Sequence, residues 1–407
     1  MRILHINCTD DGSTGKIIQV ISAEAASRGY ESYLLTPRIT HKNPKLRKVK
    51  TSLRYEQGAY RRLVKLQGFQ YGLAPLSTER ILAAIRKISP QIVHLHSINC
   101  NMVNIYRLVE FLKKNGIPTV VTNHAEFFYT GSCPHSYLCE KWKTGCGSCE
   151  NYKQSCRALW DSSALAWKKM KKAFSGHPNV HIVSVSPWSF NRSMQAPILK
   201  GLPQSTILNG VDTEIFSYGD TKKAKQDLGF DPEEKLLFHV TANFSDDPND
   251  MKGGRYLIEL AKQLENQKVR FLVAALHSSV GPLPENITLL DQIQDQNRLA
   301  DYYAAADLTV LVSQRETFGM AVAESLCCGT PVVGFESGGS ESIALPQFTQ
   351  FVPFGDVESL KNAVCNKLWL KESLDAHSVS QEAMKAYSAN RMAEEYLHLY
   401  QAMIDGL

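Results

Sequence analysis

Short apolar runs rich in β-branched residues recur along the chain. In chain order they are 3–6, 91–95, 119–123, 180–184, 236–241, 269–274, 287–290, 308–312 and 332–335. Runs of this length suit strands that are buried on both faces of a sheet. Segments of helical composition lie between them, at about 17–28, 186–192, 255–264, 298–306 and 319–328. The alternation predicts an α/β protein built from βα units, with parallel sheets.

The length of 407 residues is enough for two domains of ordinary size, each with its own core. A break between Pro197 and Pro203 separates the strands of the two halves. We therefore place an N-terminal domain at 1–200 and a C-terminal domain at 201–390. The closing helix, 391–407, is expected to cross back to the N-terminal domain.

The stretch that follows the run 308–312 combines two carboxylates with a helix start. Glu316 lies in the loop at the carboxyl end of the strand, where ligands bind in open α/β sheets. Glu324 lies in the helix, and acceptor-only carboxylates suit the hydroxyls of a sugar nucleotide. The alternative is an acidic residue complementing the helix dipole beside a solvated Glu. The free amides that could bind an anion at this helix start belong to Phe318, Gly319 and Met320.

Glu316 and Glu324 frame an E-x7-E motif that is followed by Cys-Gly-Thr-Pro-Val-Val. In order, spacing and flanking residues this stretch resembles the donor-binding signature of retaining glycosyltransferase family 4, whose members have the GT-B fold. The resemblance implies two Rossmann-like, doubly wound domains facing an interdomain cleft. It also implies that Glu324 holds the nucleotide ribose, while Glu316 and the amides after it hold the donor sugar.

A lysine before a glycine pair adds to the resemblance. Relatives place such a lysine, here Lys252, on the donor diphosphate, where a point charge can stabilise the leaving group. The alternative is that Lys252 is an ordinary solvated residue of a loop. The arginine that relatives commonly carry a few residues earlier is absent, and Asn243 lies near its place. Another cation, such as Lys16 or Arg315, could compensate.

Relatives contact the nucleotide base through the loop Asp291-Gln292-Ile293, so Ile293 is a further donor-binding candidate. The acidic residues before Lys252 could suggest a metal–diphosphate site. Enzymes of this fold generally manage without a metal, so we interpret these residues as a solvated loop and expect no cofactor to be required for catalysis. They are Asp246, Asp247 and Asp250.

The N-terminal half offers weaker signals. Gly15 follows the first strand in a loop that could cradle a phosphate, although a tight βα turn is the default explanation. His94 and His96 share one face of a strand without a third ligand, which favours a structural or acceptor-side role over a metal site. His124 follows another strand, and in the family resembled a histidine at this place faces the donor sugar near the reacting carbon. Alone, it would more often be a structural histidine.

A cysteine-rich insert at 130–157 follows this strand. In a reducing cytosol four thiolates suit a tetrahedral structural zinc ion, and C-x2-C is a usual half-site, whereas the C-x5-C half is looser than usual. Reduced cysteines packing a loop, or disulfides, are the alternatives. The insert, with its Trp-Lys-Thr-Gly-Cys, resembles that of bacterial glycosyltransferases that build colanic-acid-type exopolysaccharides. The four candidate ligands are Cys133, Cys139, Cys146 and Cys149, with Cys156 shortly after.

The charge is divided unevenly between the halves. Residues 1–200 carry 29 Lys and Arg against 11 Asp and Glu, whereas residues 201–407 carry 16 against 29. Basic residues interleaved with apolar ones at 42–66, and a second cluster at 167–172, predict contact with an anionic membrane surface; a solvated basic face is the alternative. The chain begins with a strand-like Met-Arg-Ile-Leu-His-Ile-Asn and has no run of 18 apolar residues. We therefore expect a cytoplasmic enzyme, peripheral on the inner face of the plasma membrane.

These features predict a retaining transferase of the hexosyltransferase type, moving a sugar from a UDP- or GDP-sugar to a glycan or lipid-diphosphate saccharide in surface polysaccharide synthesis. A sugar-nucleotide epimerase or a phosphorylase would share the fold. A non-catalytic, basic, zinc-bearing protein that binds membranes or nucleic acid is a third interpretation. No recognised nucleic-acid module appears, so nucleic acid is not an expected partner.

Overall fold

The computed structural model describes residues 1–406 apart from 151, 156–157 and 370–374. The chain forms two compact units. Unit 1 comprises Met1–Asn209 and Asn390–Leu407, and unit 2 comprises Gly210–Ala389. The first division thus lies further along the chain than the break at 197–203.

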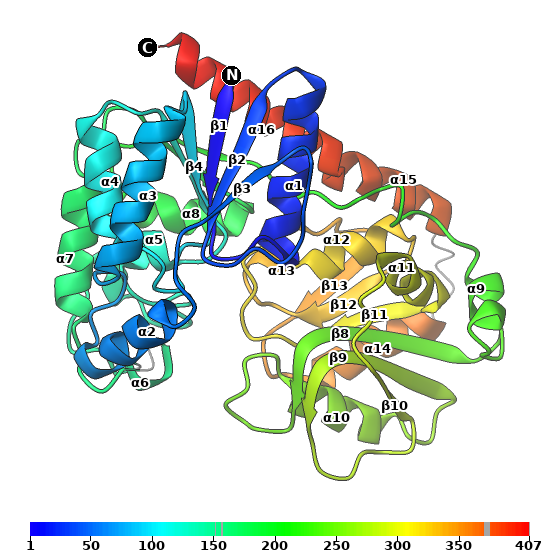
Figure 1. Ribbon diagram of the computed structural model, residues 1–407. Coiled ribbons are helices and arrows are strands. Elements are labelled where there is room, and N and C mark those ends of the chain that lie inside the picture. Colours follow the sequence, from blue (N-terminus) through cyan, green and yellow to red (C-terminus); the bar gives the residue numbers. More distant parts are fainter. Residues whose placement is uncertain (151, 156–157, 370–374, 407) are drawn as a thin grey trace. The chain divides into compact units, whose positions relative to one another are not determined.

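Unit 1 is built on a seven-stranded sheet in the order β3-β2-β1-β4-β5-β6-β7, with every neighbouring pair parallel (Figure 1). The predicted parallel sheet is confirmed. Its strands are β1 (Arg2–Ile6), β2 (Glu31–Thr36), β3 (Arg47–Lys50), β4 (Ile92–Leu95), β5 (Thr119–Asn123), β6 (Val180–Ser184) and β7 (Gln204–Thr206).

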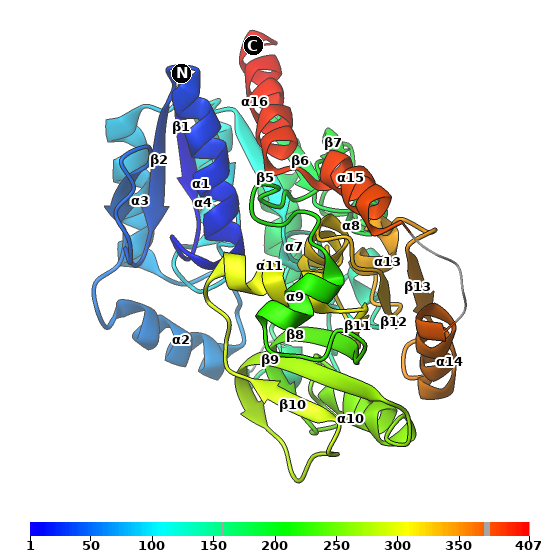
Figure 2. The same cartoon turned by 90° about the vertical axis from the view of Figure 1, so that its right-hand side faces the viewer.

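Side chains alternate between two buried faces of this sheet, which is why its central strands are apolar throughout. Ile3 of β1 packs into a cluster with residues of α1 and α16, and these two helices lie beside each other in Figure 2. Leu4 packs on the opposite face with residues of α3, α4 and α7. His5 is on the same side as Ile3, so a polar ring enters an otherwise apolar layer.

The helices of unit 1 begin with α1, which starts at Gly12 because the Asp11 side chain accepts a hydrogen bond from the Gly12 amide (2.7 Å). This is five residues before the predicted start at Ile17. The helices are α1 (Gly12–Ser27), α2 (Glu56–Gln67), α3 (Pro75–Ile88), α4 (Ile105–Lys114), α5 (Phe127–Thr130), α6 (Tyr152–Ser155), α7 (Ser163–Phe174), α8 (Pro187–Gln195) and α16 (Ala389–Asp405), with a 3₁₀ turn at Lys141–Lys143.

Unit 2 has a six-stranded parallel sheet in the order β10-β9-β8-β11-β12-β13. Strands β8 and β9 run several residues past the predicted ends, because they continue to pair with each other as far as Ser245 and Ser279. The strands are β8 (Lys235–Ser245), β9 (Val269–Ser279), β10 (Ile287–Leu290), β11 (Leu308–Leu311), β12 (Val332–Phe335) and β13 (Thr349–Val352).

Helices cover both faces of this second sheet as well. Leu257 of α10 and Leu360 of α14 pack into one cluster with the strand residue Val310. On the other face, Phe238 of β8 contacts the rings of Tyr302 and Tyr303 from α11. The helices are α9 (Thr221–Asp227), α10 (Gly254–Gln263), α11 (Gln296–Ala305), α12 (Met320–Cys327), α13 (Gly339–Ile343), α14 (Val357–Trp369) and α15 (Ala376–Tyr387).

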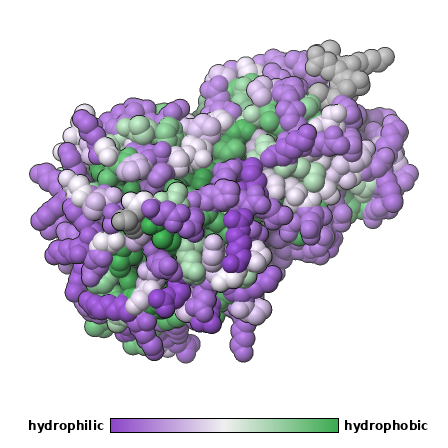
Figure 3. Space-filling model, turned by 90° about the horizontal axis from the view of Figure 1, so that it is seen from above, coloured by the Kyte–Doolittle hydropathy of each residue, from purple (hydrophilic) through white to green (hydrophobic). Residues whose placement is uncertain are grey.

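The face drawn in Figure 3 is largely hydrophilic, with hydrophobic side chains showing between the polar ones. Among the helices that the structure describes, none combines the length and the apolar character needed to cross a membrane.

Candidate functional site

The candidate site of unit 2 is organised by an ion pair between Lys252 and Glu316. Lys252 lies in the loop between β8 and α10, and Glu316 in the loop between β11 and α12. The Lys252 Nζ and the Glu316 Oε1 are 2.7 Å apart, and the two side chains are 31% and 28% exposed. Two charged groups from separate loops therefore meet at the carboxyl edge of the sheet, where polar ligands bind in this architecture.

Glycine and backbone hydrogen bonds hold the two loops together. The Gln314 amide donates to the Met251 carbonyl (2.8 Å). Gly253 has φ +71°, and a Cβ atom there would lie 2.1 Å from the Val312 carbonyl oxygen. Only glycine fits this close approach. Packing therefore explains the glycine after Lys252, because only a residue without a side chain lets the lysine loop lie against the strand that leads to Glu316.

A third loop supports Glu316 from the other side. The Glu316 amide donates to the Ser337 carbonyl (3.0 Å), and the Gly339 amide donates to the Glu316 carbonyl (2.8 Å). The Glu341 carboxylate accepts from the amides of Ser337 (2.9 Å) and Gly338 (2.7 Å). Glu341 thereby caps α13, and the loop before this helix acts as a scaffold for Glu316.

Helix α12 presents its first amides without a side-chain cap, because its N-cap residue is Gly319. Glu324 lies in its second turn, and its Oε2 accepts a hydrogen bond from the Tyr303 hydroxyl (3.0 Å). Burial, together with the charge of Glu324, raises the pKa of Tyr303 well above its usual value, so the hydroxyl stays a donor. Phe318 is buried against Tyr387, so among its groups only the backbone could contact a ligand.

A cavity of about 220 Å³ lies where β10 ends beside Ala274 of β9. Ile293, the predicted base-contacting residue, is part of its lining. Asn243 lies just beyond the last β8 residue of this lining, on the extension of β8 that pairs with β9. The lining residues are Val240, Thr241, Ala242, Ala274, Ala275, Leu276, Gln292, Ile293 and Leu299.

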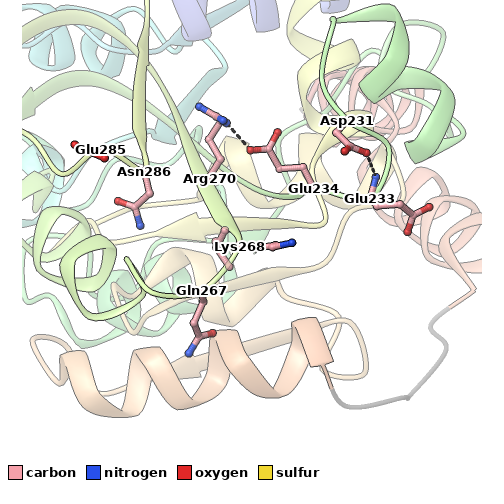
Figure 4. Close-up of a pocket in the computed structure, with 9 residues that line it drawn as sticks. Asp231, Glu233, Glu234, Gln267, Lys268, Arg270, Glu285 and Asn286 are labelled. Carbon is pink, nitrogen blue, oxygen red and sulfur yellow. Dashed lines mark hydrogen bonds and ion pairs between the residues drawn. The ribbon is translucent and has the colours of Figure 1, made fainter.

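A larger cavity, of about 490 Å³, opens at the opposite edge of the same sheet (Figure 4). It lies at the amino ends of β8 and β9, and its lining is dominated by charged side chains such as Glu234 and Arg270, which pair at 2.7 Å. Ligands of open α/β sheets bind at the carboxyl ends of the strands. The smaller cavity and the Lys252–Glu316 ion pair, which lie at the carboxyl edge, are therefore the candidate site for a ligand in this unit.

A further residue, His239, interacts electrostatically with Lys252 and Glu316 and is absent from the sequence predictions. It is buried in the middle of β8, and its Nδ1 lies 2.8 Å from the Val310 carbonyl, whereas its Nε2 has no partner among the described residues. The pKa of His239 is lowered to about 4, mainly by burial and to a smaller extent by the charge of Lys252, while the Val310 hydrogen bond and the charge of Glu316 oppose this shift. A histidine within an apolar run offers no sequence signal of such a role.

In unit 1, Gly15 has a packing explanation. A Cβ atom at this position would lie 2.7 Å from the backbone carbon of Asp10, so helix α1 approaches the preceding loop too closely for a side chain. Asp10 is itself buried, and it accepts hydrogen bonds from Thr40 and His41 and from the Lys48 ammonium (2.7 Å). Lys48 therefore forms its ion pair inside the fold.

Histidines of β1 and β4, and of the segments that follow β4 and β5, meet in unit 1. The expectation that His94 and His96 have no third ligand nearby is wrong, because His5 of β1 brings a ring nitrogen within 4.8 Å of theirs. The register of β1 against β4 places His5 directly beside His94. His124 joins the group, with its Nε2 at 3.2 Å from the His96 Nδ1. Burial lowers the pKa of His124 to about 4, so the ring is neutral near pH 7.

The predicted zinc ligands are only partly brought together. Cys133, Cys139 and Cys149 line a cavity of about 320 Å³, whereas the Cys146 thiol lies 3.5 Å from the Thr130 carbonyl. Within the described ranges, His5, His94 and His96 are a group whose three ligand atoms all lie within 4.8 Å of one another. The four cysteines do not form such a group. Cys156 lies outside the described residues. Zinc at this insert stays a prediction.

Two parallel sheets of seven and six strands, with polar loops at the carboxyl edges, define the GT-B fold class. Solved structures agree. Sucrose-phosphate synthase from Thermosynechococcus elongatus superposes with a TM-score of 0.73 at 16% identity over 100% of both chains. Anabaena HepE in complex with UDP-glucose superposes with a TM-score of 0.62 at 13% identity, over 98% of this chain and 99% of HepE. Likeness at such identities establishes the fold alone.

Family models narrow the class. The model described as Glycosyltransferase Family 4 matches residues 15–215, and that described as Glycosyl transferases group 1 matches residues 220–386. The chain therefore belongs to the group 1 glycosyltransferases of family 4. D-inositol 3-phosphate glycosyltransferase 2 of Catenulispora acidiphila is 30% identical over 154 residues, which are 33% of this chain and 35% of that protein. The chain thus aligns with about a third of the length of this curated relative.

Proposed function

We propose that this protein is a retaining glycosyltransferase that moves a sugar from a nucleotide diphosphate sugar to a glycan or lipid-linked saccharide acceptor. The observation that carries the proposal is the Lys252–Glu316 pair at 2.7 Å, beside the uncapped start of α12. A cation, an acceptor-only carboxylate and free amides at one sheet edge match the leaving diphosphate and the hydroxyls of a sugar donor.

Each group has a chemical role in this proposal. Lys252 and the first amides of α12 stabilise the negative charge that develops on the leaving diphosphate, so no metal ion is required for catalysis. Glu316 and the amides of Phe318, Gly319 and Met320 hold the sugar hydroxyls. Glu324 holds the ribose, oriented by Tyr303 (3.0 Å). Lys16 or Arg315 would supply the positive charge of the arginine that is absent near Asn243.

The base of the donor would occupy the cavity of about 220 Å³ that includes Ile293. HepE, which shares the fold, was solved in complex with UDP-glucose, and we therefore take a UDP-sugar as the donor to test first, with a GDP-sugar as the alternative. In unit 1, His124 would contact the donor sugar near the reacting carbon, and Gly15, which lies in the first turn of α1 and not in a loop, would allow the donor to approach the backbone closely. Bound donor and acceptor, held in a fixed geometry, would then react with retention at the anomeric carbon.

The acceptor would lie at an anionic membrane surface. Helix α2 exposes Leu63 (45%) and Leu66 (53%) beside exposed Arg61, Arg62 and Lys65. This helix occupies only the second part of the predicted 42–66 stretch, because 47–50 forms strand β3. A mixture of exposed apolar and basic side chains suits the headgroup region of an anionic bilayer, and the protein would then act in surface polysaccharide synthesis on the cytoplasmic side.

The donor hypothesis is tested by thermal unfolding of the full chain with UDP, GDP, UDP-glucose and GDP-mannose. A ligand that binds only the folded state raises the unfolding temperature, and we expect the uridine compounds to do so. Incubation with the stabilising donor alone distinguishes transfer from epimerisation, since an epimerase converts the donor without an acceptor. No stabilisation by any of the four compounds at millimolar concentration would contradict the proposal.

A further inference from the structure

Two cysteine thiols meet at the carboxyl edge of the sheet in unit 1. Cys8 lies two residues after the end of β1, and Cys100 lies in the irregular segment between β4 and α4. These strands are neighbours, and the Cys8 amide donates to the Ser97 carbonyl (2.9 Å) beyond their paired residues. The Cys100 thiol donates a hydrogen bond to the Cys8 sulfur. The fold therefore brings together two sulfur atoms that are far apart in the sequence.

Both thiols lie at the margin of the apolar core and keep some access to solvent. Cys8 and Cys100 are half-buried, and they pack against the same cluster of buried residues in unit 1. The side-chain amide of Gln57, from α2, donates to the Cys100 sulfur (3.6 Å). Partial exposure of this kind admits a small oxidant.

The hydrogen bond between the thiols gives them different reactivities. It lowers the pKa of Cys8, an effect that outweighs the opposing effect of burial, and together with burial it raises the pKa of Cys100 well above its usual value. The thiolate is the nucleophilic form of cysteine. Cys8 is therefore the thiol that reacts first, while Cys100 stays protonated beside it. A reactive thiol next to a second thiol that resolves its first product is typical of redox-sensing cysteines.

The backbone around the two cysteines allows the sulfur atoms to close the remaining distance. A disulfide needs an S–S bond of about 2.05 Å. Asn7, the neighbour of Cys8, is tied to the start of α1, because its side-chain amide donates to the Thr14 hydroxyl (2.9 Å). Cys100, in contrast, lies outside any helix or strand. Cys100 is therefore the partner that moves when the bond forms.

Metal binding by this pair is disfavoured. Structural zinc sites have four protein ligands, and two thiols alone leave the ion half coordinated. In the part of the chain that the structure describes, the close group of metal-ligating atoms is that of His5, His94 and His96, and it contains neither cysteine.

We propose that Cys8 and Cys100 are an oxidation site, at which hydrogen peroxide converts the two thiols to a disulfide that joins the ends of β1 and β4. The Cys8 thiolate attacks one peroxide oxygen, so that an S–O bond forms and the O–O bond breaks. The released hydroxide takes up the proton that Cys8 lost to solvent, giving water. The Cys100 sulfur then attacks the sulfur of the Cys8 sulfenic acid. The S–S bond forms, the S–O bond breaks, and the Cys100 proton leaves with the hydroxyl as a second water.

Two electrons thus pass from the two sulfurs to the peroxide, and exchange with a free thiol such as glutathione reverses the reaction. The disulfide would act on the candidate site through α1. The bond from Asn7 to Thr14 connects the cross-linked segment to the first turn of this helix, which contains Gly15. Under the proposed function Gly15 lies close to the donor, so a shift of this turn would misplace the donor. This effect on transfer rests on the proposed function, whereas the formation of the disulfide does not.

Peptide mapping of the full-length protein tests the cross-link. Reduced protein is treated with hydrogen peroxide, its remaining thiols are alkylated, and it is digested with trypsin without reduction. Cys8 and Cys100 are then in separate peptides, 3–16 and 88–107, each of which contains one cysteine. We expect these peptides to be joined, with the mass of two hydrogen atoms lost, and to separate after treatment with dithiothreitol. Full alkylation of both cysteines after peroxide, or pairing of either with a cysteine of the insert instead, would overturn the proposal.

Single variants test the roles of the two thiols. Cys100→Ser should stop at the Cys8 sulfenic acid, which dimedone captures, because the serine hydroxyl can still donate to Cys8. Cys365→Ser replaces a half-buried cysteine of α14 in unit 2, and it should form the cross-link as the wild type does. Thermal unfolding shows whether each variant is folded, and Cys100→Ala replaces Cys100→Ser if that variant is not. Dimedone on Cys100 of the wild type, with none on Cys8, would refute the assigned roles.

Activity separates this inference from the proposed function. With an active donor, peroxide should lower kcat of the wild type by roughly tenfold or more, since small displacements of bound reactants cost large factors in rate. Dithiothreitol should restore the activity. An unchanged kcat in fully cross-linked protein would refute the effect on the site. Absence of transfer by the reduced protein would count against the proposed function alone, because the cross-link is detected by mass without a substrate.

Discussion

Lys252 and Glu316 are 64 positions apart in the sequence, yet their side chains form an ion pair of 2.7 Å. Each is about a third exposed, so the pair contributes little to stability, typically less than about 1 kcal/mol. The loops that carry them are nevertheless held by backbone hydrogen bonds and by a glycine that accepts no side chain. A rigid support for a pair of low stabilising value is typical of a binding site.

Removal of either partner should therefore abolish transfer and preserve the fold. We expect Lys252→Ala and Glu316→Ala each to lower kcat/KM by roughly 10²- to 10³-fold or more, since each removes a charge that faces the donor. The unfolding temperature should stay within a few degrees of the wild type. Lys222→Ala, which breaks an exposed ion pair with Glu233 in the same unit, is the matched control. Near-native turnover in both site variants would show that the pair lies outside the site.

The Tyr303–Glu324 hydrogen bond should contribute to nucleotide affinity. Tyr303→Phe keeps the buried ring and removes only the hydroxyl that donates to Glu324 (3.0 Å). Because hydrogen bonds to charged groups contribute about 1.5–3 kcal/mol, we expect UDP to bind roughly tenfold more weakly or worse. Calorimetric titration measures this affinity. The double variant that combines Tyr303→Phe with Glu324→Gln should bind UDP little more weakly than Glu324→Gln alone. Unchanged UDP affinity in Tyr303→Phe would mean that the hydroxyl does not orient the ribose-binding carboxylate.

Much of the fold was readable from the sequence, because strands buried on both faces leave a clear apolar signal. The runs 119–123, 180–184, 287–290 and 332–335 coincide with β5, β6, β10 and β12. The ends of β8 and β9 were missed, since their extension depends on pairing with each other and involves polar residues such as Asn243 and His277. Strand β3 was missed for the same reason, because its sequence Arg-Lys-Val-Lys is dominated by charge.

The residues of the candidate site could be predicted from the sequence only where they belong to a recognisable motif. Glu316 and Lys252 belong to a recognisable pattern, and the structure brings them together. His5 and His239 each lie within an apolar run, and their importance follows from neighbours on other strands. Register between strands is a long-range property, so a sequence read locally cannot place His5 beside His94.

Mild acid should destabilise the protein. His239 and His5 have folded-state pKa values of about 4 and about 3 because they are buried, whereas an unfolded histidine has a pKa of about 6.5. The unfolded chain therefore binds more protons below pH 6.5, and stability is lost as the pH falls from about 6.5 towards 4. For His239 the loss at pH 5 is about 2 kcal/mol.

Urea unfolding at pH 7 and pH 5 measures this loss. His239→Gln retains a side-chain donor for the Val310 carbonyl but cannot be protonated in this range, so its stability should fall less between the two pH values. His277→Gln, which replaces an exposed histidine of β9, is the control and should behave as the wild type does. An equal loss in wild type and His239→Gln would mean that other groups set the acid sensitivity.

The cysteine insert carries a prediction about metal content. If Cys133, Cys139, Cys146 and Cys149 hold a structural zinc ion, protein purified without chelators should contain about one zinc per chain. Cys139→Ser combined with Cys149→Ser should remove the metal and lower the unfolding temperature, because a structural zinc contributes directly to folding. Cys327→Ser, which alters a buried thiol of unit 2, should retain the zinc. If the purified protein contains no zinc and its thiols are reactive, the alternative holds, namely that the cysteines are reduced and bind no metal.

Association with anionic membranes should depend on helix α2 and the segment that packs against its end. The Leu159 amide donates to the Lys65 carbonyl (2.8 Å), and Trp160 beside it is 71% exposed. Large exposed apolar side chains next to Arg61 and Arg62 would enter the headgroup region, where each basic residue contributes about 1 kcal/mol. In sedimentation with phosphatidylglycerol vesicles, Arg61→Glu with Arg62→Glu should weaken binding by tenfold or more, and Trp160→Ser by a similar factor.

The controls for this prediction use composition and salt. Vesicles of phosphatidylcholine should bind little of the wild type, and 0.5 M salt should release it from the anionic vesicles, because counterions screen exposed charges. Trp369→Ser removes an exposed tryptophan from α14 in unit 2 and should bind as the wild type does. Equal binding by the wild type and the α2 variants would instead assign membrane contact to another basic cluster. The lysines of α7 are then the next to test, because they are exposed while Trp167 and Met170 of the same helix are buried in the core.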